Sequence, residues 1–299
     1  MPLVSIGMPV FNDKKFIHKA VDSLLSQTFT DFELILSDDC SSDGSSEICQ
    51  AYAQQDERIK YIRQNQNIGI SRNMKFLLNS GTGKYFMWAA NDDIWDKHFL
   101  ETLLKGLESN PKAIVSFSPI CFIDERDQLI KDNPARFTDY SGPSAQIRLH
   151  KLINIFDDGF GYGLFRREEI LNVEFPIWWG INKITAYNNI YPTLCFYLTK
   201  GDYVLCGDKP LWYNRIKEQG NINHKEPYVN NFIRGSFALS LRKFNLCWIS
   251  CKEIVKAGGS ARLAFAIFPE IFYKWFFRPS LGNFIRQFSS YRKGKLKLW

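Results

Sequence analysis

Three short polar stretches of this sequence contain residue types that bind cations and phosphates. Residues 9–12 (PVFN), 37–41 (SDDCS) and 91–93 (NDD) each follow an apolar stretch. Adjacent carboxylates such as Asp92 and Asp93 repel each other, so an uncompensated pair is destabilising. A hard divalent cation relieves that repulsion, and Mg²⁺ or Mn²⁺ is commonly held by carboxylates together with substrate phosphates. The pattern therefore predicts an acidic site for a metal ion and a phosphate-bearing ligand.

Other kinds of site are less well supported. Each polar stretch, taken singly, is also typical of a turn or a helix cap, where Asp, Asn and Ser are common. The sequence has neither a GxxxxGK[ST] nor a GxGxxG motif, so phosphate binding by a glycine-rich loop is unsupported. Seven Cys without a CxxC pair and four scattered His argue against zinc. The remaining hypothesis is a metal that joins carboxylates to the diphosphate of a nucleotide donor and neutralises its charge.

The hydrophobic pattern predicts a frame that brings these stretches together. Strands are predicted at residues 4–8, 32–36, 59–62, 85–89 and 113–117, and helices at 16–26, 45–54, 71–78 and 98–107. Pro9 is expected to end the first strand, and Ser71 to cap the third helix. This alternation predicts an α/β fold with a mainly parallel sheet covered on both faces. Because carboxyl ends of parallel strands share one edge, the polar stretches are expected to meet there.

The composition is that of a globular protein whose positive charge lies at one end. Of the 299 residues, 45% are hydrophobic and 23% are charged, which excludes a wholly disordered or collagen-like chain. The net charge is +7, and residues 252–299 contain ten Lys or Arg and two Glu, so the remainder is nearly neutral. We therefore expect no nucleic-acid partner, and a tail with an anionic partner of its own.

The basic tail is also rich in aromatic residues, among them Trp275, Phe276, Phe277 and Trp299. Rings mixed with cations are typical of helices in a bilayer interface, where anionic lipid adds about 1 kcal/mol per well-placed cation. The sequence thus favours an anionic membrane surface as the partner, over a helical appendage packed on the rest of the chain. No apolar run reaches the roughly 18 residues of a spanning helix, and we expect no signal peptide.

Seven stretches carry a signal in their order and spacing: residues 4–12, 23–28, 38–43, 67–69, 71–73, 91–93 and 163–167. Together they resemble the family 2 glycosyltransferases of GT-A fold that build bacterial surface glycans. The resemblance implies a Rossmann-like domain over residues 1–215, with the nucleotide half at 1–95 and the acceptor half at 96–215. A helical region over 216–299, which associates with membranes, is expected to follow.

The resemblance also implies roles for individual residues. Asp93 would bind the metal, Mn²⁺ or Mg²⁺, and Asp92 would face the ribose or the sugar; both are candidate catalytic residues. Asp39 would hydrogen-bond the nucleotide base. Further contacts to the nucleotide-sugar would come from Pro9, Val10, Phe11, Asn12, Arg72, Asn73 and Asn91. Core packing is the alternative for Phe11, and a solvated helix position is the alternative for Arg72.

One departure from the family concerns the general base. Inverting members place a carboxylate near the start of a late helix, whereas residues 185–191 (TAYNNIY) contain none and have Asn188 at that position. An amide is not basic at neutral pH. Three explanations stay open: Asp157, Asp158 or Glu174 serves instead, another base acts, or the chain binds the donor without efficient transfer.

Aromatic residues also precede that stretch. Trp178 and Trp179 are a candidate platform for a sugar acceptor, because ring faces stack on sugars, although a packed loop tryptophan is the alternative. His224 follows Tyr213-Asn214-Arg215, where family members often have a closing loop; a surface histidine is the favoured interpretation.

The sequence therefore predicts a metal-dependent glycosyltransferase that moves a sugar from a nucleotide-diphosphate donor to a hydroxyl of a glycan or lipid-linked acceptor, preferably with inversion. We expect it in the cytoplasm, peripheral at the inner face of the cell membrane. Two alternatives are a membrane-associated sugar-binding partner with little activity and a nucleotidyltransferase, which would release pyrophosphate.

Overall fold

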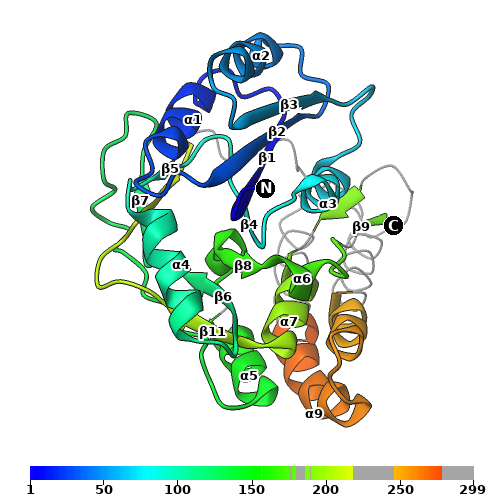
Figure 1. Cartoon of the computed structure of the whole chain (residues 1–299). Helices are drawn as coiled ribbons and strands as arrows, with labels where there is room; N and C mark the ends of the chain where they lie inside the picture. The colour runs from blue at the N-terminus through cyan, green and yellow to red at the C-terminus, as the bar shows by residue number, and fades with distance from the viewer. Residues whose placement is uncertain (156, 176, 180–185, 189, 218–245, 278–299) are drawn as a thin grey trace, which may run out of the picture. The chain divides into compact units, whose positions relative to one another are not determined.

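The computed structural model describes the chain except for residues 156, 176, 180–185, 189, 218–245 and 278–299 (Figure 1). The chain divides into two compact units. The first contains Met1–Pro143, Asp157–Glu174 and Gly201–Gly220, and the second contains Ser144–Phe156, Phe175–Lys200 and Asn221–Trp299. The predicted domain boundary between residues 215 and 216 stays a prediction.

A seven-stranded sheet forms the centre of the first unit (Figure 1). Its strand order is β11-β6-β8-β4-β1-β2-β3. The strands are β1 (Val4–Val10), β2 (Phe32–Asp38), β3 (Ile59–Arg63), β4 (Tyr85–Trp88), β6 (Ala113–Phe117), β8 (Leu164–Arg166) and β11 (Asp202–Leu205). All neighbours pair in parallel except β8, which is antiparallel to both β4 and β6. The predicted mainly parallel sheet is confirmed.

The prediction that Pro9 ends the first strand is wrong, because β1 continues to Val10. The carbonyl of Gly7 accepts a hydrogen bond from Ala89 on the β4 side, and that of Val10 accepts one from Asp39 on the β2 side. Successive residues of a strand alternate sides, so Pro9 faces the β4 side beyond the end of β4. Its missing N–H therefore costs no ladder hydrogen bond.

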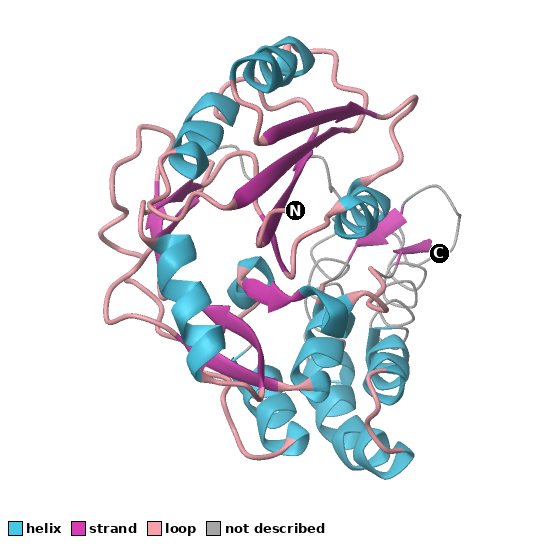
Figure 2. Cartoon of the chain, viewed as in Figure 1, coloured by secondary structure: helices cyan, strands magenta, loops and turns pink. Residues whose placement is uncertain are grey.

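Helices flank this sheet (Figure 2). They are α1 (Ile17–Leu25), α2 (Ser45–Gln55), α3 (Ile70–Ser80) and α4 (Phe99–Ser109). The prediction of Ser71 as the cap of α3 is wrong: Gly69 holds the N-cap position, with φ +81°, which glycine adopts readily. Helix α3 packs so closely on β1 that a Cβ added to Gly7 would lie 2.9 Å from the Cβ of Leu77.

A second, three-stranded sheet was not predicted. Its order is β5-β12-β7, formed by Ile94–Trp95, Trp212–Arg215 and Ile120–Ile123. Strand β12 is antiparallel to β5, with Trp212 opposite Trp95. This pairing places β12, near the end of the first unit, beside the residues that follow β4.

The second unit is mainly helical in its described part. It contains α5 (Ala145–Ile155), α7 (Tyr191–Lys200), α9 (Ala261–Ile271), a π-helix (Phe272–Phe277) and a hairpin of β9 (Ile177–Trp179) and β10 (Ala186–Asn188). Helix α5 packs against α7 and α9. Among the described residues, no helix has both the length and the apolar character needed to cross a membrane.

Candidate functional site

The loops that follow β1 and β2 are joined into one rim at the carboxyl end of the sheet. The N–H of Asn12 donates to Ser41 Oγ at 3.0 Å, and Ser42 N–H donates to Asn12 Oδ1 at 2.9 Å. The N–H of Asp13 donates to Ser45 Oγ at 3.0 Å. Asn12 has φ +49°, in the left-handed region that asparagine tolerates better than most residues. The rim is therefore held by side chains of both loops.

Asp39 extends this rim to the start of α3. Its carboxylate is buried and accepts the N–H groups of Ile68 at 2.7 Å and Gly69 at 2.9 Å. These bonds hold residues 68–69, which precede the predicted donor-binding residues Arg72 and Asn73, beside the end of β2. The predicted contact of Asp39 with a nucleotide base stays a prediction.

Asp93 is enclosed by the second sheet. Its carboxylate, buried at 1% exposure, accepts hydrogen bonds from Trp212 Nε1 at 2.9 Å, Asn214 Nδ2 at 3.2 Å and Arg215 N–H at 2.8 Å. Burial and the neighbouring charge of Asp92 raise the pKa of Asp93, and the three donors act against that rise. Both oxygens are engaged by the fold. The metal role of Asp93 stays a prediction, which this enclosure does not favour.

Asp92 has a different environment although it is the adjacent residue. Its carboxylate is 2.8 Å from the ammonium of Lys217, which is 2.7 Å from Asp13 Oδ2. The Lys217 side chain retains 29% exposure. Burial raises the pKa of Asp13, although Lys217 acts to lower it. Asp13, Asp92 and Lys217 thus form a partly exposed charged cluster beside the rim.

Sequence reasoning missed Asp13 and Lys217, and it missed how Arg215 supports them. Arg215 Nε donates to the carbonyl of Asp92 at 2.7 Å, and its other nitrogens contact the Asp124 carbonyl and the Asp127 carboxylate. Position 215 is more than 120 residues from Asp92 along the chain, so no local pattern predicted this pairing. The run Tyr213-Asn214-Arg215 was the available signal.

The structure separates the predicted base-pocket residues by exposure. Phe11 is 46% exposed, which rules out core packing in this structure, whereas Val10 is fully buried in the core. Pro9 and Asn91 are partly exposed. Phe11 and Asn91 follow β1 and β4, whose carboxyl ends share one edge, so the structure brings them to the predicted side of the sheet.

Arg72 and Asn73 lie in the first turn of α3. The Arg72 side chain is exposed, as the solvated-helix alternative requires. Asn73 is buried and its Nδ2 donates to the carbonyl of Ser37 at 2.9 Å. Asn73 thus fastens α3 to the end of β2, while the exposed guanidinium is the one of the two that a ligand could reach.

Other predicted residues lie in the second unit. Trp178, Trp179 and Asn188 belong to the β9–β10 hairpin, in which Trp178 pairs with Tyr187 and Asn188 with Ile177. Their predicted roles stay predictions. His224 lies outside the described residues.

Among the three alternative bases, Asp158 has the most suitable position. Asp157 is buried and accepts hydrogen bonds from Thr138 Oγ1 at 2.6 Å and Gly159 N–H at 3.1 Å. Glu174 lies 4.0 Å from the ammonium of Lys75. Because β8 is antiparallel to β4 and β6, its amino end lies at the carboxyl ends of those strands, and Asp158 precedes β8 by six residues. Partial desolvation and the charge of Asp157 raise the pKa of Asp158.

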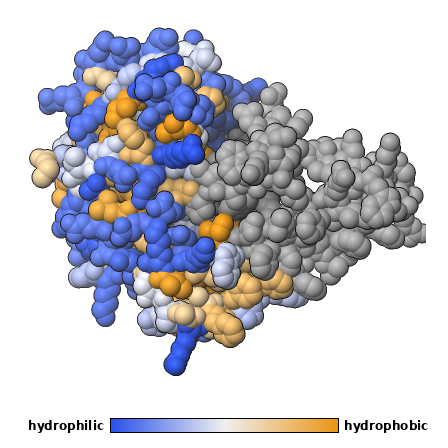
Figure 3. Space-filling model, turned by 90° about the vertical axis from the view of Figure 1, so that its right-hand side faces the viewer, coloured by the Kyte–Doolittle hydropathy of each residue, from blue (hydrophilic) through white to orange (hydrophobic). Residues whose placement is uncertain are grey.

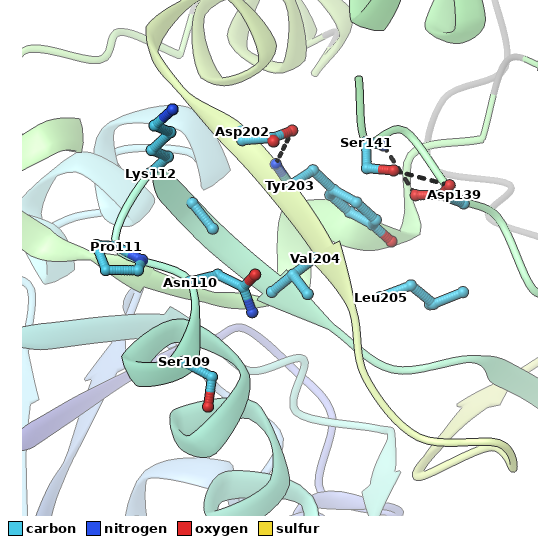
Figure 4. A pocket seen from close by; sticks show the side chains of 11 residues that line it. Ser109, Asn110, Pro111, Lys112, Asp139, Ser141, Asp202, Tyr203, Val204 and Leu205 are labelled. Atoms are coloured by element: carbon cyan, nitrogen blue, oxygen red, sulfur yellow. Dashed lines mark hydrogen bonds between the residues drawn. The ribbon is translucent and has the colours of Figure 1, made fainter. Parts of the chain in front are cut away.

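A separate pocket of about 670 Å³ lies along β11 and the amino end of β6 (Figure 4). Asp139, Ser141 and Asp202 line it, and Ser141 Oγ donates to Asp139 at 2.9 Å. None of the residues predicted for the nucleotide-sugar site lines this pocket.

The sequence matches the model of a known protein family. Residues 5–171, more than half of the sequence, match the model of the glycosyl transferase family 2. The chain belongs to this family. The resemblance noted in the sequence is confirmed.

Curated relatives in this family come from several bacteria. The chain is 27% identical over 204 residues to a Campylobacter jejuni protein named GalNAc(5)-diNAcBac-PP-undecaprenol beta-1,3-glucosyltransferase, covering 67% of this chain and 63% of that one. It is 31% identical over 113 residues to glycosyltransferase GlyG of Streptococcus pneumoniae, covering 38% of each. It is 38% identical over 106 residues to the Bacillus subtilis protein named "Putative teichuronic acid biosynthesis glycosyltransferase TuaG", covering 35% and 41%. The chain thus spans less than two thirds of the length of these relatives.

Solved structures share the fold. S. aureus TarS 1–349 superposes with a TM-score of 0.63 at 15% identity, covering 95% of this chain and 80% of that one. A mannosyltransferase from Pyrobaculum calidifontis in complex with GDP-Man and Mn²⁺ has a TM-score of 0.51 at 14% identity, covering 90% and 73%. The predicted GT-A type of α/β fold is confirmed.

Proposed function

We propose that this protein is a glycosyltransferase that moves a sugar from a nucleotide-diphosphate sugar to a hydroxyl of a glycan or lipid-linked acceptor in bacterial surface-glycan synthesis. The observation that carries the proposal is the partly exposed carboxylate of Asp92 beside the joined loops of β1 and β2. In a family 2 chain this is the edge where a donor binds.

The donor class is supported by two structural neighbours. One TarS structure is a complex with UDP-GlcNAc, and the Pyrobaculum enzyme carries GDP-Man. Both ligands are nucleotide-diphosphate sugars. In this chain the exposed ring of Phe11 offers a face for a base, and the exposed guanidinium of Arg72 offers charge for a phosphate.

The proposed chemistry is a single displacement with inversion. The acceptor oxygen forms a bond to the anomeric carbon, the bond from that carbon to the diphosphate breaks, and the nucleoside diphosphate leaves with the electron pair. Asp158 takes the proton of the acceptor hydroxyl, because Asn188 has no basic group. Mn²⁺ or Mg²⁺ stays the cofactor that the sequence predicts.

The acceptor is proposed to be membrane-linked. The Campylobacter relative is named for an undecaprenol-linked substrate. In the described part of the tail, Trp248, Phe265 and Tyr273 are 54%, 82% and 54% exposed, and Lys252 lies over the Trp248 ring. On the face drawn in Figure 3, hydrophobic residues lie in patches between hydrophilic ones. We propose a peripheral position on an anionic membrane surface at the cytoplasmic side.

The test is a donor panel. Purified protein is mixed with UDP-, GDP- and dTDP-sugars, and both thermal stability and released nucleotide are measured. A donor at 100 times its Kd adds about 2.7 kcal/mol of stability. We expect one nucleotide to stabilise the protein and to be released as a nucleoside diphosphate with an undecaprenyl-diphosphate glycan as acceptor. Release of pyrophosphate would identify a nucleotidyltransferase, and binding without transfer to any acceptor would favour the sugar-binding partner.

A further inference from the structure

Lys217 occupies the position that a cation would need in this site. Its ammonium lies 2.7 Å from Asp13 Oδ2 and 2.8 Å from Asp92 Oδ2. The two carboxylates follow different strands, β1 and β4. One positive charge therefore joins the two acidic loops at the edge where the donor is proposed to bind.

The position of Lys217 is set by the residues before it. The N–H of Arg215 donates to Asp93 at 2.8 Å, and the N–H of Ile216 donates to the carbonyl of Ile123 at 2.8 Å. Strand β12 is also paired with β5, directly after Asp93. Hydrogen bonds thus hold the backbone up to residue 216, and the side chain of Lys217 extends from this fixed backbone to the two carboxylates.

The residues as they stand do not fit a divalent ion. Both oxygens of Asp93 accept hydrogen bonds from β12, so Asp13 and Asp92 are the nearby carboxylates left for a metal. Each of them already contacts the Lys217 ammonium, and Mg²⁺ demands near-octahedral oxygen ligands at about 2.0–2.1 Å. A metal bound there would also face a like charge at close range.

An ammonium can do the work required of a cation here. It has three N–H donors, and lysine binds phosphate as a point charge. Two carboxylates contact Lys217, and the side chain keeps 29% of its surface exposed. Within the described residues these two carboxylates take two of its three donors, so the third is available to an oxygen of the donor diphosphate. As the bond to the anomeric carbon breaks, that oxygen gains negative charge, which the fixed ammonium stabilises.

We propose that Lys217 takes the place of the divalent cation, so that this chain binds the donor diphosphate and transfers the sugar without a metal. The proposal rests on the proposed function. The bonds formed and broken in the displacement are the same: the electron pair goes to the nucleoside diphosphate and the proton goes to the base.

The experiment compares wild type, Lys217→Met and Lys217→Arg after treatment with EDTA. Transfer and binding of the free nucleoside diphosphates UDP and GDP are measured in EDTA and with added Mn²⁺. Lys105→Met is the matched control, because Lys105 is exposed and pairs with Glu101 within α4. We expect wild type and the control to keep their rate in EDTA within about twofold. Lys217→Met should lose about 100-fold in transfer and tenfold or more in diphosphate binding, with partial rescue by Lys217→Arg.

The outcomes separate this proposal from the proposed function. Wild-type transfer or diphosphate binding that is lost in EDTA and restored by Mn²⁺ overturns the metal-free role of Lys217 and leaves the glycosyltransferase standing. If no sugar is transferred under any condition, the proposed function fails. The role of Lys217 is still supported if the wild-type protein binds the diphosphates in EDTA and Lys217→Met does not. Where Lys217→Met does not fold, loss of wild-type transfer in EDTA still overturns the proposal, and Lys217→Arg tests the residue itself: a change in diphosphate binding in EDTA supports the role of Lys217, and binding equal to wild type contradicts it.

Discussion

The two ends of strands β1 and β2 each carry an acidic group with a lysine, but the groups differ in what surrounds them. At the amino end, Glu33 is 4% exposed and accepts hydrogen bonds from Ser5 at 2.6 Å, Lys60 at 2.6 Å and the Thr82 hydroxyl at 2.7 Å. A further bond comes from the N–H of Thr82 at 2.8 Å. The fold itself satisfies this carboxylate.

At the carboxyl end, the corresponding charged side chains are partly exposed to solvent. Lys217 contacts both Asp13 and Asp92, but in the described part of the chain its ammonium retains exposed surface and one hydrogen-bond donor. A buried carboxylate whose hydrogen bonds all come from the fold has a structural role, whereas a carboxylate whose partner is still exposed can take part in ligand binding. The same difference separates the sequence neighbours Asp92 and Asp93. Location at the end of a strand is therefore not enough to assign a carboxylate to chemistry.

The largest expected effect belongs to Asp92→Asn. The substitution removes the charge that orients Lys217 at 2.8 Å, so we expect kcat/KM for transfer to fall about 100-fold or more while the melting temperature changes little. Steady-state kinetics and thermal unfolding of the same preparation test this. Asp132→Asn, at an exposed position, is the control and should behave like wild type. Transfer by Asp92→Asn at the wild-type rate would show that this carboxylate is not part of the site.

Asp93→Asn is expected to have the opposite profile. The amide has one acceptor oxygen, so at least one of the donors Trp212, Asn214 and Arg215 would face an NH₂ group instead. An unsatisfied buried donor makes the loss of unfolding free energy about 3 kcal/mol. Urea unfolding measures it. A stability equal to wild type, combined with loss of transfer, would restore Asp93 to the predicted metal role and remove the contrast with Asp92.

The sheet could be predicted because its signals are local. Strand 113–117 and the buried face of α1 follow from hydrophobic spacing within about ten residues. The end of β1 could not be predicted in this way, because β1 can contain Pro9 only where β4 no longer pairs with it. Ser71 was mistaken for a cap because Gly69, with φ +81°, holds the N-cap position and α3 begins at Ile70.

The meeting of the polar stretches at one sheet edge could be predicted, but the contacts among their side chains could not. The polar stretches after β1, β2 and β4 meet at one edge because parallel strands share their direction. Whether Asp92 or Asp93 turns inward is decided by β12, whose pairing with β5 joins residues more than 110 positions apart. Local pattern carries no information on such a pairing, so Lys217 was not found from the sequence.

Glu33→Gln tests the amino end. The amide oxygen can keep the bonds from Ser5 and Thr82, which share Oε1, but the NH₂ group then faces the ammonium of Lys60 in place of Oε2. The ion pair is lost and two donors oppose each other, so we expect about 2 kcal/mol lower unfolding free energy. Transfer per folded molecule should equal wild type. Glu57→Gln, at an exposed position, controls for the loss of one negative charge. A drop in kcat with unchanged stability would contradict the structural role of this end.

The pH dependence of stability gives the smallest effect, and its sign differs between the two ends. Burial opposes ionisation of Glu33, but hydrogen bonds from Lys60, Ser5 and Thr82 outweigh it and lower its pKa from 4.5 to about 2. The unfolded chain therefore binds this proton more readily, so the stabilisation is complete above about pH 4.5 and is lost as the pH falls toward 2. Urea midpoints between pH 5 and pH 3 should accordingly fall less steeply for Glu33→Gln than for wild type.

Asp13 provides the opposite case at the carboxyl end. Burial raises its pKa above the ordinary value of 3.8 despite the contact with Lys217, so the folded protein binds this proton more readily than the unfolded chain. Its contribution favours the folded state at low pH and is lost as the pH rises through the raised pKa. Asp13→Asn removes that contribution, so its urea midpoint should fall more steeply than that of wild type between pH 5 and pH 3. Equal slopes for Asp13→Asn and Glu33→Gln would mean that the two ends of the sheet do not differ in how the fold treats a carboxylate.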